Sequence, residues 1–252
     1  MYCCLLPGAI CWYCWLCQHE AGDLFGSLYN EFVAMSSPPI LFDLDGTLLD
    51  TLDDLAFAGN QALEQCGHPV HPVEKYRYFV GDGLATLIDR ITPSSAGEEE
   101  KTQCFDLFRS IYSQCWHDRT RPYDGITAML ATVKQAGRRL CILSNKPHDF
   151  TLLCVSHFFD DDVFELVLGQ REGVAKKPHP AGALEIAQRM GVAPGSCLYV
   201  GDTRVDMETG KSAGMFTIGV LWGFRDSAEL QENGADVLVQ TPDELARIVL
   251  SM

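Results

Sequence analysis

The stretch Ile40-Leu41-Phe42-Asp43-Leu44-Asp45-Gly46 constrains what this chain can fold into more than any other. An apolar run that ends near a glycine is typical of a buried strand. In parallel α/β sheets, reactive groups gather at the carboxyl ends of the strands. Two carboxylates this close repel one another unless a cation lies between them, and Mg²⁺ prefers such oxygen ligands. By itself, the stretch fits a metal site about as well as it fits a solvated Asp-Gly turn.

Length and charge narrow the class of protein. The chain has 252 residues, enough for one large domain or for a core with a smaller domain inserted. Its formal net charge of -15 argues against general nucleic-acid binding, which needs clustered Lys and Arg. The same charge argues against a polybasic attachment to a membrane. The negative net charge still allows a phosphorylated substrate, because a metal ion and a few cationic side chains can make the potential at the site positive.

The 11 cysteines do not form a disulfide pattern. Five of them lie within the first 17 residues, and the other six are scattered singly through apolar contexts. Isolated cysteines behave as small buried hydrophobic residues, and an odd total without regular spacing is not a disulfide framework. These observations predict a reducing compartment and a cytoplasmic location.

Residues 1–37 differ in composition from the rest of the chain. The segment 1–17 is apolar and rich in Cys, but it is interrupted and too short for a membrane span. It has no basic region ahead of its apolar part, so it does not match a secretory signal. Its Cys11-x-x-Cys14-x-x-Cys17 spacing lacks the second ligand pair of a zinc finger. We expect residues 1–37 to be a disordered or artefactual extension, and the functional protein to begin near Met35.

A helix is expected directly after the opening stretch. Thr51 and Asp54 resemble a capping box, and Asp50 is an alternative cap. Apolar residues then recur at helical spacing as far as Gly67, which is typical of a helix end.

Further helical patterns fill the next part of the chain, with little strand signal. Helices are expected at Leu84–Ile91 and Cys104–Cys115, separated by an acidic linker at 97–101. The whole block, residues 51–121, is predicted to be a small all-helical cap domain inserted after the first strand.

From Pro122 onward, apolar runs that fit buried strands alternate with helical patterns. Such alternation predicts a doubly wound, parallel-sheet α/β core of the Rossmann-like kind, made of residues 38–50 and 122–252. The strands are expected at Leu140–Ser144, Phe164–Leu168, Cys197–Val200, Phe216–Val220 and Asp236–Val239, and helices at Ile126–Ala136, His148–His157 and Ala181–Met190.

Three further polar clusters fall at strand ends or helix starts of this predicted core: Ser144-Asn145-Lys146, Lys176-Lys177-Pro178, and Gly201-Asp202-Thr203-Arg204-Val205-Asp206. Singly, they fit a helix cap, a solvated proline turn and a Gly-Asp turn. Together they favour one assembled site, because the carboxyl ends of parallel strands meet at the same edge of a sheet.

These residue types suit phosphoryl transfer. A carboxylate is ionised at neutral pH and can attack phosphorus to form an aspartyl-phosphate. A second carboxylate can protonate the leaving oxygen and then activate water. Ser and Lys side chains can hold the transferring oxygens, while Mg²⁺ neutralises the charge between phosphate and carboxylates. Asp202 would complete the metal shell, and Asp206 would act through water or by orienting the ligands.

The chain from about Pro39 onward resembles the haloacid dehalogenase superfamily, and within it the phosphoglycolate phosphatase-like branch with a helical cap. Four motifs carry the resemblance: Asp43-x-Asp45-Gly46-Thr47, Ser144, Lys177 before Pro178, and Gly201-Asp202-x-x-x-Asp206. It implies that Asp43 is the nucleophile and Asp45 the acid/base. It implies that Ser144 and Lys177 hold the phosphate, and Thr47 and Asn145 are also predicted to bind it. The implied Mg²⁺ ligands are Asp43, the backbone carbonyl of Asp45 and Asp202, and Asp206 is also assigned to the metal site.

The resemblance also separates branches of the superfamily. Dehalogenases lack an aspartate at the position of Asp45, because a halide leaves without a proton. Phosphonatases need a Schiff-base lysine in the cap, and neither Lys75 nor Lys101 lies in a context that indicates one. The resemblance therefore implies phosphate-ester chemistry.

The cap stretch Tyr76–Gly83 is similar to the specificity loop of phosphoglycolate phosphatases, and it marks Arg77, Gly81, Asp82 and Gly83 as substrate-specificity residues. An acidic Asp82 facing a glycolate carboxylate would be unfavourable unless it points away or Arg77 offsets it. This departure from the family pattern leaves the substrate open.

The leading hypothesis is a Mg²⁺-dependent phosphatase for a small phosphorylated metabolite, with 2-phosphoglycolate as the best candidate. A β-phosphoglucomutase-type phosphotransferase, a phosphoacceptor signalling module and a catalytically silent binding protein are the alternatives. A receiver module has no use for a cap or an acid/base residue, and no motif is missing, which disfavours the last two. The oligomeric state is left open.

Overall fold

The computed structural model of the chain describes residues 38–252, so the predictions for residues 1–37 lie outside the described part. Six parallel strands form one sheet in the order β5-β4-β1-β6-β7-β8. The strands are β1 (Ile40–Phe42), β4 (Leu140–Pro147), β5 (Leu166–Gln170), β6 (Leu198–Gly201), β7 (Phe216–Val220) and β8 (Val237–Val239). The predicted parallel α/β class is confirmed.

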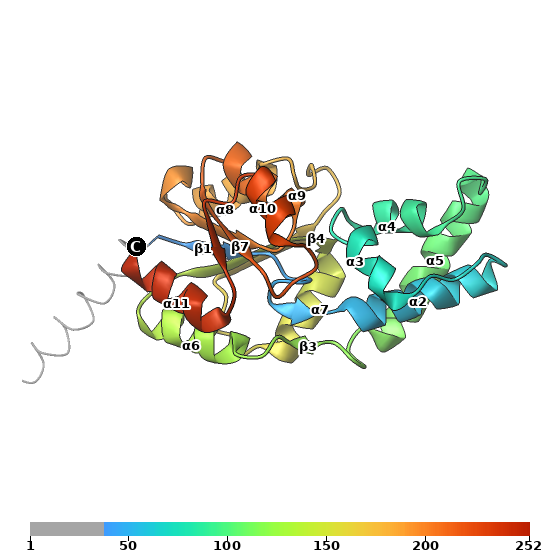
Figure 1. Cartoon of the computed structure of the whole chain (residues 1–252), viewed down its shortest axis with the longest axis horizontal. Coiled ribbons are helices and arrows are strands. Elements are labelled where there is room, and N and C mark those ends of the chain that lie inside the picture. The colour runs from blue at the N-terminus through green and yellow to red at the C-terminus, as the bar shows by residue number, and fades with distance from the viewer. Residues whose placement is uncertain (1–37) are drawn as a thin grey trace, which may run out of the picture. The chain divides into compact units, whose positions relative to one another are not determined.

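Helices cover both faces of this sheet (Figure 1). The first face carries α6 (Ile126–Gln135), α7 (His148–Phe158) and α11 (Pro242–Ser251). The second carries α8 (Ala181–Arg189), α9 (Arg204–Ser212) and α10 (Ser227–Glu232), and a short 3-10 turn, η2 (Pro194–Ser196), precedes β6.

The central strand β1 is apolar at every position because both of its faces are covered. Ile40 and Phe42 are fully buried in one hydrophobic cluster, and Leu41 is fully buried in a second cluster on the opposite face. Side chains alternate between the faces of a strand, so the strand must end before Asp43 and Asp45 can serve one site.

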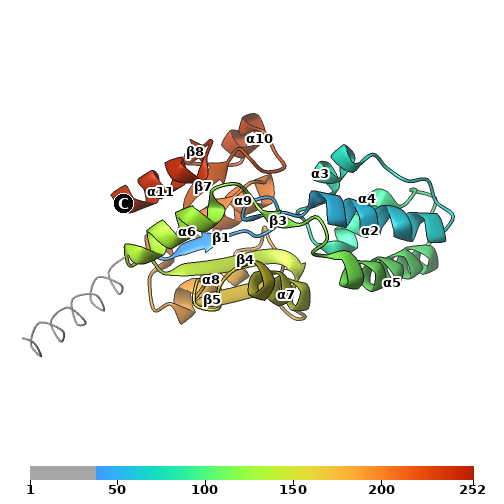
Figure 2. The ribbon, with the colours of Figure 1, turned by 90° about the horizontal axis from the view of Figure 1, so that it is seen from below.

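The helical cap is inserted between two short segments that pair with each other. The antiparallel strands β2 (Leu49–Asp50) and β3 (Arg121–Pro122) mark where the chain leaves the core and where it returns. Between them lie α2 (Leu52–Gln65), η1 (Val73–Lys75), α3 (Tyr76–Phe79), α4 (Leu84–Ile91) and α5 (Glu98–Cys115). Figure 2 shows these helices packed together at one end of the core.

Two local predictions in the cap are wrong. The acidic segment 97–101 is not a linker, because α5 begins at Glu98 and the Gly97 N–H donates to Glu100 Oε2 at 2.9 Å. Acidic residues in a first turn are stabilised by the positive end of the helix dipole. Thr51 precedes α2 but makes no side-chain cap. The carboxylate of Asp54 instead accepts from the N–H and hydroxyl of Thr120, both at 2.8 Å, which ties the start of the cap to its end.

Within residues 38–252, no helix combines the length and the apolar character that crossing a membrane requires.

Candidate active site

Three buried carboxylates meet where β1 and β6 end. Asp43 follows β1, Asp202 follows β6, and Asp206 lies in the first turn of α9. Each offers an oxygen within 4.8 Å of the others, and all three side chains are buried. β1 and β6 are paired in parallel register, with Phe42 opposite Val200, which brings the two loops together. The sequence predicted that separate motifs meet at one edge of the sheet, and the structure brings these three residues together there.

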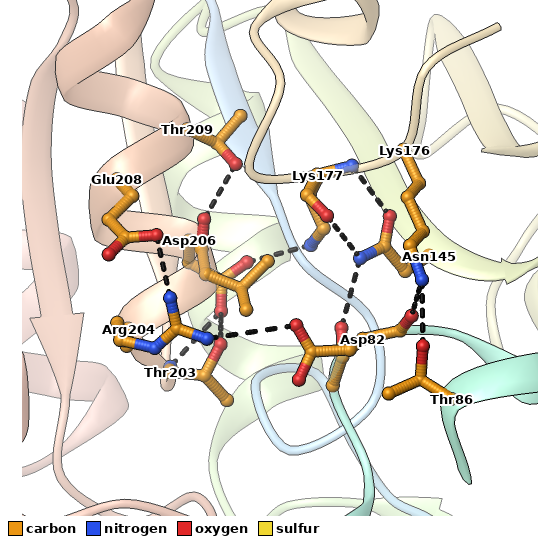
Figure 3. A network of polar contacts seen from close by, with 12 residues as sticks. Asp82, Thr86, Asn145, Lys176, Lys177, Thr203, Arg204, Asp206, Glu208 and Thr209 are labelled. Atoms are coloured by element: carbon orange, nitrogen blue, oxygen red, sulfur yellow. Dashed lines mark hydrogen bonds and ion pairs between the residues drawn. The ribbon is translucent and has the colours of Figure 1, made fainter. Parts of the chain in front are cut away.

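One ammonium group compensates part of this negative charge. Lys177 Nζ lies 2.9 Å from Asp43 Oδ1 and donates to Asp206 Oδ1 at 2.7 Å. The other oxygen of Asp206 accepts from the N–H and the hydroxyl of Thr203 at the start of α9 (Figure 3). Both oxygens of Asp206 are therefore engaged, so this residue orients Lys177 and caps a helix.

The carboxylate of Asp202 is held by two donors from different loops. Thr47 Oγ1 donates to Asp202 Oδ1 at 2.8 Å, and the N–H of Phe224 donates to Oδ2 at 2.8 Å. Thr47, predicted to bind phosphate, is fully buried and contacts Asp202. The loop after β7, which supplies Phe224, was not singled out by the sequence, because a backbone N–H leaves no residue-specific signal.

Gly223 in this loop lets the backbone approach Asp202 closely. A Cβ at this position would lie 2.3 Å from Asp202 Cβ and 2.4 Å from the carbonyl oxygen of Gly46. We expect Gly223→Ala to displace Asp202 and to weaken divalent-cation binding about 10- to 100-fold, the usual cost of disturbing groups that orient metal ligands. Titration with Mg²⁺, followed by the rise in Tm, measures the change.

Gly97→Ala is the matched control for this prediction, because a Cβ at Gly97 meets nothing within 4 Å. Its Mg²⁺ titration should overlay that of the unsubstituted protein. An unchanged titration for Gly223→Ala would show that the close approach does not position Asp202.

A cavity of about 50 Å³ lies beside the carboxylates, between core and cap. Its polar wall includes Asp43, Asp45 and Ser144, and its apolar wall includes Leu87 and Phe108 of the cap. One water needs roughly 10–15 Å³ of such space, so the cavity admits only a small molecule. Ser144, predicted from the sequence to bind phosphate, is at this wall.

The electrostatics of the cluster favour binding of a cation. Burial, followed by the charge of Asp206, raises the pKa of Asp43 to about 7, although Lys177 acts in the opposite direction. Burial and the charges of Asp206 and Asp43 likewise raise the pKa of Asp202 well above its usual range. Asp43 Oδ1 is buried without a well-directed hydrogen bond. Carboxylate oxygens in this arrangement fit a hard divalent cation, which Asp43 and Asp202 could hold.

Comparison with known proteins agrees with this geometry. The sequence model of the family described as "Haloacid dehalogenase-like hydrolase" matches residues 40–220. The chain belongs to this family.

Several relatives of this chain are named phosphoglycolate phosphatase. The chain is 32% identical over 212 residues to the phosphoglycolate phosphatase of Colwellia psychrerythraea, covering 82% of this chain and 94% of the relative. It is 32% identical over 198 residues to the phosphoglycolate phosphatase of Neisseria gonorrhoeae, covering 77% and 84%. The crystal structure of a predicted phosphoglycolate phosphatase from Haemophilus somnus superposes with a TM-score of 0.78 at 26% identity, covering 84% and 97%.

The cap loop that is predicted to set substrate specificity, within Tyr76–Gly83, borders the cavity through its glycines. Gly81 and Gly83 line the cavity, whereas Asp82 does not. The Asp82 carboxylate pairs with Arg90 at 2.5 Å. It also lies 3.8 Å from Arg204 of the core (Figure 3). The expected conflict between Asp82 and a substrate carboxylate is therefore absent from this arrangement, because Asp82 points away.

Core side chains hold the same loop from the other side. Asn145 Nδ2 donates to the carbonyl oxygens of Gly81 and Lys177, each at 3.0 Å, and Asn145 Oδ1 accepts from the N–H of Lys177. Lys176 Nζ donates to the carbonyl oxygen of Asp82 at 2.7 Å (Figure 3). Asn145, predicted to bind phosphate, thus links the cap loop to the Lys177 loop.

Arg77, the remaining predicted specificity residue, lies outside the lining of the cavity. Its guanidinium donates to the carbonyl oxygen of Gly223, and its own carbonyl oxygen accepts from Arg225. In this haloacid dehalogenase-like chain, Arg77 therefore joins the cap to the loop that carries Phe224.

Proposed function

We propose that this protein is a Mg²⁺-dependent phosphatase that hydrolyses a small phosphomonoester through an aspartyl-phosphate on Asp43. The observation that carries the proposal is the buried carboxylate of Asp43 beside Lys177 Nζ, in the wall of a cavity that Asp45 also lines. Family membership and the name shared by the relatives support the same reaction class.

In the first half-reaction, an Asp43 carboxylate oxygen attacks phosphorus while the bond from phosphorus to the ester oxygen breaks. Asp45 donates its proton to that oxygen, so the product leaves as an alcohol. Lys177 and the Ser144 hydroxyl stabilise the negative charge on the transferring oxygens. The Lys177 ammonium is buried, which strengthens its interaction with that charge.

In the second half-reaction, the Asp45 carboxylate takes a proton from water. The resulting hydroxide attacks phosphorus and breaks its bond to Asp43, which restores the free carboxylate and releases inorganic phosphate. A Mg²⁺ held by Asp43, the Asp45 backbone carbonyl and Asp202 would neutralise charge between the phosphate and the carboxylates. Asp206 would support the site through Lys177.

The proposed substrate is a short phosphate ester, with 2-phosphoglycolate as the best candidate. The small cavity and its apolar cap wall favour a compact molecule. The outward orientation of Asp82 removes an acidic group from the neighbourhood of a substrate carboxylate. The relatives named phosphoglycolate phosphatase support the same choice.

A turnover screen tests the proposal. The protein is incubated with Mg²⁺ and 2-phosphoglycolate, sugar phosphates, nucleotides or pyrophosphate, and released phosphate is measured. The expected result is fastest release from 2-phosphoglycolate. Conversion of a hexose 1-phosphate to its 6-phosphate would favour the phosphotransferase alternative, and phosphate release from no ester would overturn the proposal.

Mg²⁺ binding should depend on pH because of the raised pKa of Asp43, about 7 without metal against 3.8 for an ordinary aspartate. The metal-free fold retains this proton longer than the unfolded chain, so its unfolding free energy should fall as pH rises from about 4 to 7. Mg²⁺ needs the ionised form, so its affinity should fall about tenfold per pH unit below 7. The Mg²⁺-induced rise in Tm should therefore be larger at pH 8 than at pH 5.5.

The control for this prediction is Asp43→Asn, which has no proton to displace at that position. Its response to Mg²⁺ should be weaker and should vary less with pH. A rise in Tm of the same size at both pH values in the unsubstituted protein would contradict the assignment of Asp43 as a ligand.

A further inference from the structure

Lys146 is a buried cation that the proposed reaction does not use. It lies near the end of β4, two residues beyond Ser144, and its side chain is 3% exposed. Its Nζ donates to both carboxylate oxygens of Asp45, at 3.0 and 3.3 Å, and to the hydroxyl of Tyr112 at 2.7 Å. A buried ammonium with these three acceptors has its charge and its hydrogen-bonding capacity satisfied.

Tyr112 belongs to the cap helix α5 and is itself held in place. Its ring is stacked on Phe108 with a centroid distance of 5.5 Å, and it meets Phe150 of the core helix α7 edge-on at 5.1 Å. Lys146 Nζ lies 4.8 Å from the centroid of the same ring, within the range of a cation–π contact. The hydroxyl therefore presents a fixed acceptor from the cap to a core lysine.

The carboxylate of Asp45 depends on this arrangement for its orientation. Within residues 38–252, the side-chain hydrogen bonds that Asp45 accepts both come from Lys146. Asp45 lies beyond the end of β1, so the sheet does not fix its side chain. Lys146 also lines the cavity and is the one basic side chain among its lining residues.

We propose that Lys146 and Tyr112 are positioning residues that hold the Asp45 carboxyl group where it can donate a proton to the leaving oxygen. The inference rests on the proposed function. The proton passes from Asp45 to the ester oxygen as the bond to phosphorus breaks, and Lys146 keeps its own protons throughout. Tyr112 belongs to the cap and Asp45 to the core. The Asp45 carboxyl group is therefore held in position when the cap packs against the core as it does in this structure.

The alternative role for Lys146 is binding of a substrate carboxylate, and three substrates separate the two roles. 2-Phosphoglycolate has a poor leaving group and a carboxylate, ethyl phosphate has a poor leaving group and no carboxylate, and p-nitrophenyl phosphate needs no acid. The measured quantity is kcat/KM, because it reports the steps up to aspartyl-phosphate formation and leaves out the later attack by water.

For Lys146→Met, we expect kcat/KM to fall about 100-fold on both alkyl esters, the scale of a catalytic group misplaced by about 1 Å. On p-nitrophenyl phosphate the loss should stay below about threefold. Tyr112→Phe removes one hydroxyl and keeps the ring, so a loss of about tenfold on the alkyl esters is expected, with the aryl ester unaffected. Tyr112→Phe also keeps the test decisive if Lys146→Met folds poorly.

Lys134→Met is the matched control, since this lysine pairs with Asp162 at the surface of the core. It should retain unsubstituted values on all three esters. Equal losses for Lys146→Met on the three esters, or a loss confined to 2-phosphoglycolate, would overturn the inference and leave the proposed function intact. Failure of the unsubstituted protein to hydrolyse any of the three with Mg²⁺ would reject the proposed function and the inference with it.

Discussion

Asp43→Asn is expected to reduce turnover of every phosphate ester by about 10⁴-fold or more, the scale seen when a catalytic nucleophile is removed. The amide keeps the shape of the side chain but cannot attack phosphorus. The loss should be the same for alkyl and aryl esters, because the nucleophile is needed whatever group leaves. Phosphate release at saturating 2-phosphoglycolate and at saturating p-nitrophenyl phosphate measures it.

The same variant should fold well, which separates loss of chemistry from loss of structure. Without metal, the fold favours the neutral form of Asp43, since its pKa is raised to about 7. The neutral amide resembles that form, so at pH 8 the metal-free variant should have a higher Tm than the unsubstituted protein. Asp161→Asn, at an exposed position, is the control and should change neither the turnover nor the Tm. Near-normal turnover by Asp43→Asn would exclude Asp43 as the nucleophile.

The parts of the site that could be predicted from sequence lie at the ends of buried strands. An apolar run followed by acidic residues has a clear pattern, and parallel strands bring their carboxyl ends to one edge. This reasoning located Asp43, Asp202 and Asp206, which the structure brings within 4.8 Å of one another. It also separated the parallel core from the helical cap, because the period of the apolar residues changes after Asp50.

Other parts depend on contacts between distant segments, and sequence periodicity carries no signal for them. Tyr112 and Lys146 are 34 positions apart and meet through the packing of cap on core. The N–H of Phe224 reaches Asp202 from a loop of ordinary composition. The orientation of Asp82 likewise follows from Arg90, in the helix α4 that comes after it, and not from the glycines beside it.

Local capping rules failed where a tertiary partner competed. Asp54 has the spacing of a capping residue for α2, but the donors of Thr120 reach its carboxylate from the end of the cap. The competing partner is 66 residues away, and it is stronger because it satisfies a fully buried carboxylate. The contact between Asp54 and Thr120 joins the segment where the chain enters the cap to the segment where it returns to the core. A side-chain cap at Thr51 would not join these segments.

Asp45→Asn should separate acid catalysis from nucleophilic attack. We expect kcat/KM to fall about 10²- to 10⁴-fold on 2-phosphoglycolate and ethyl phosphate, the usual contribution of a general acid. On p-nitrophenyl phosphate the loss should be less than about tenfold, because p-nitrophenolate leaves without a proton. A uniform loss on all three esters would contradict the assignment of Asp45 as the acid.

Combining this substitution with Lys146→Met tests whether the two residues act as one unit. If Lys146 acts through Asp45, the double variant should have nearly the kcat/KM of Asp45→Asn alone on 2-phosphoglycolate, since the group that Lys146 orients is already lost. Independent contributions would multiply, so a further loss of about 100-fold would show that Lys146 has a separate task. The direct contacts between Lys146 Nζ and both Asp45 oxygens, at 3.0 and 3.3 Å, favour the first outcome.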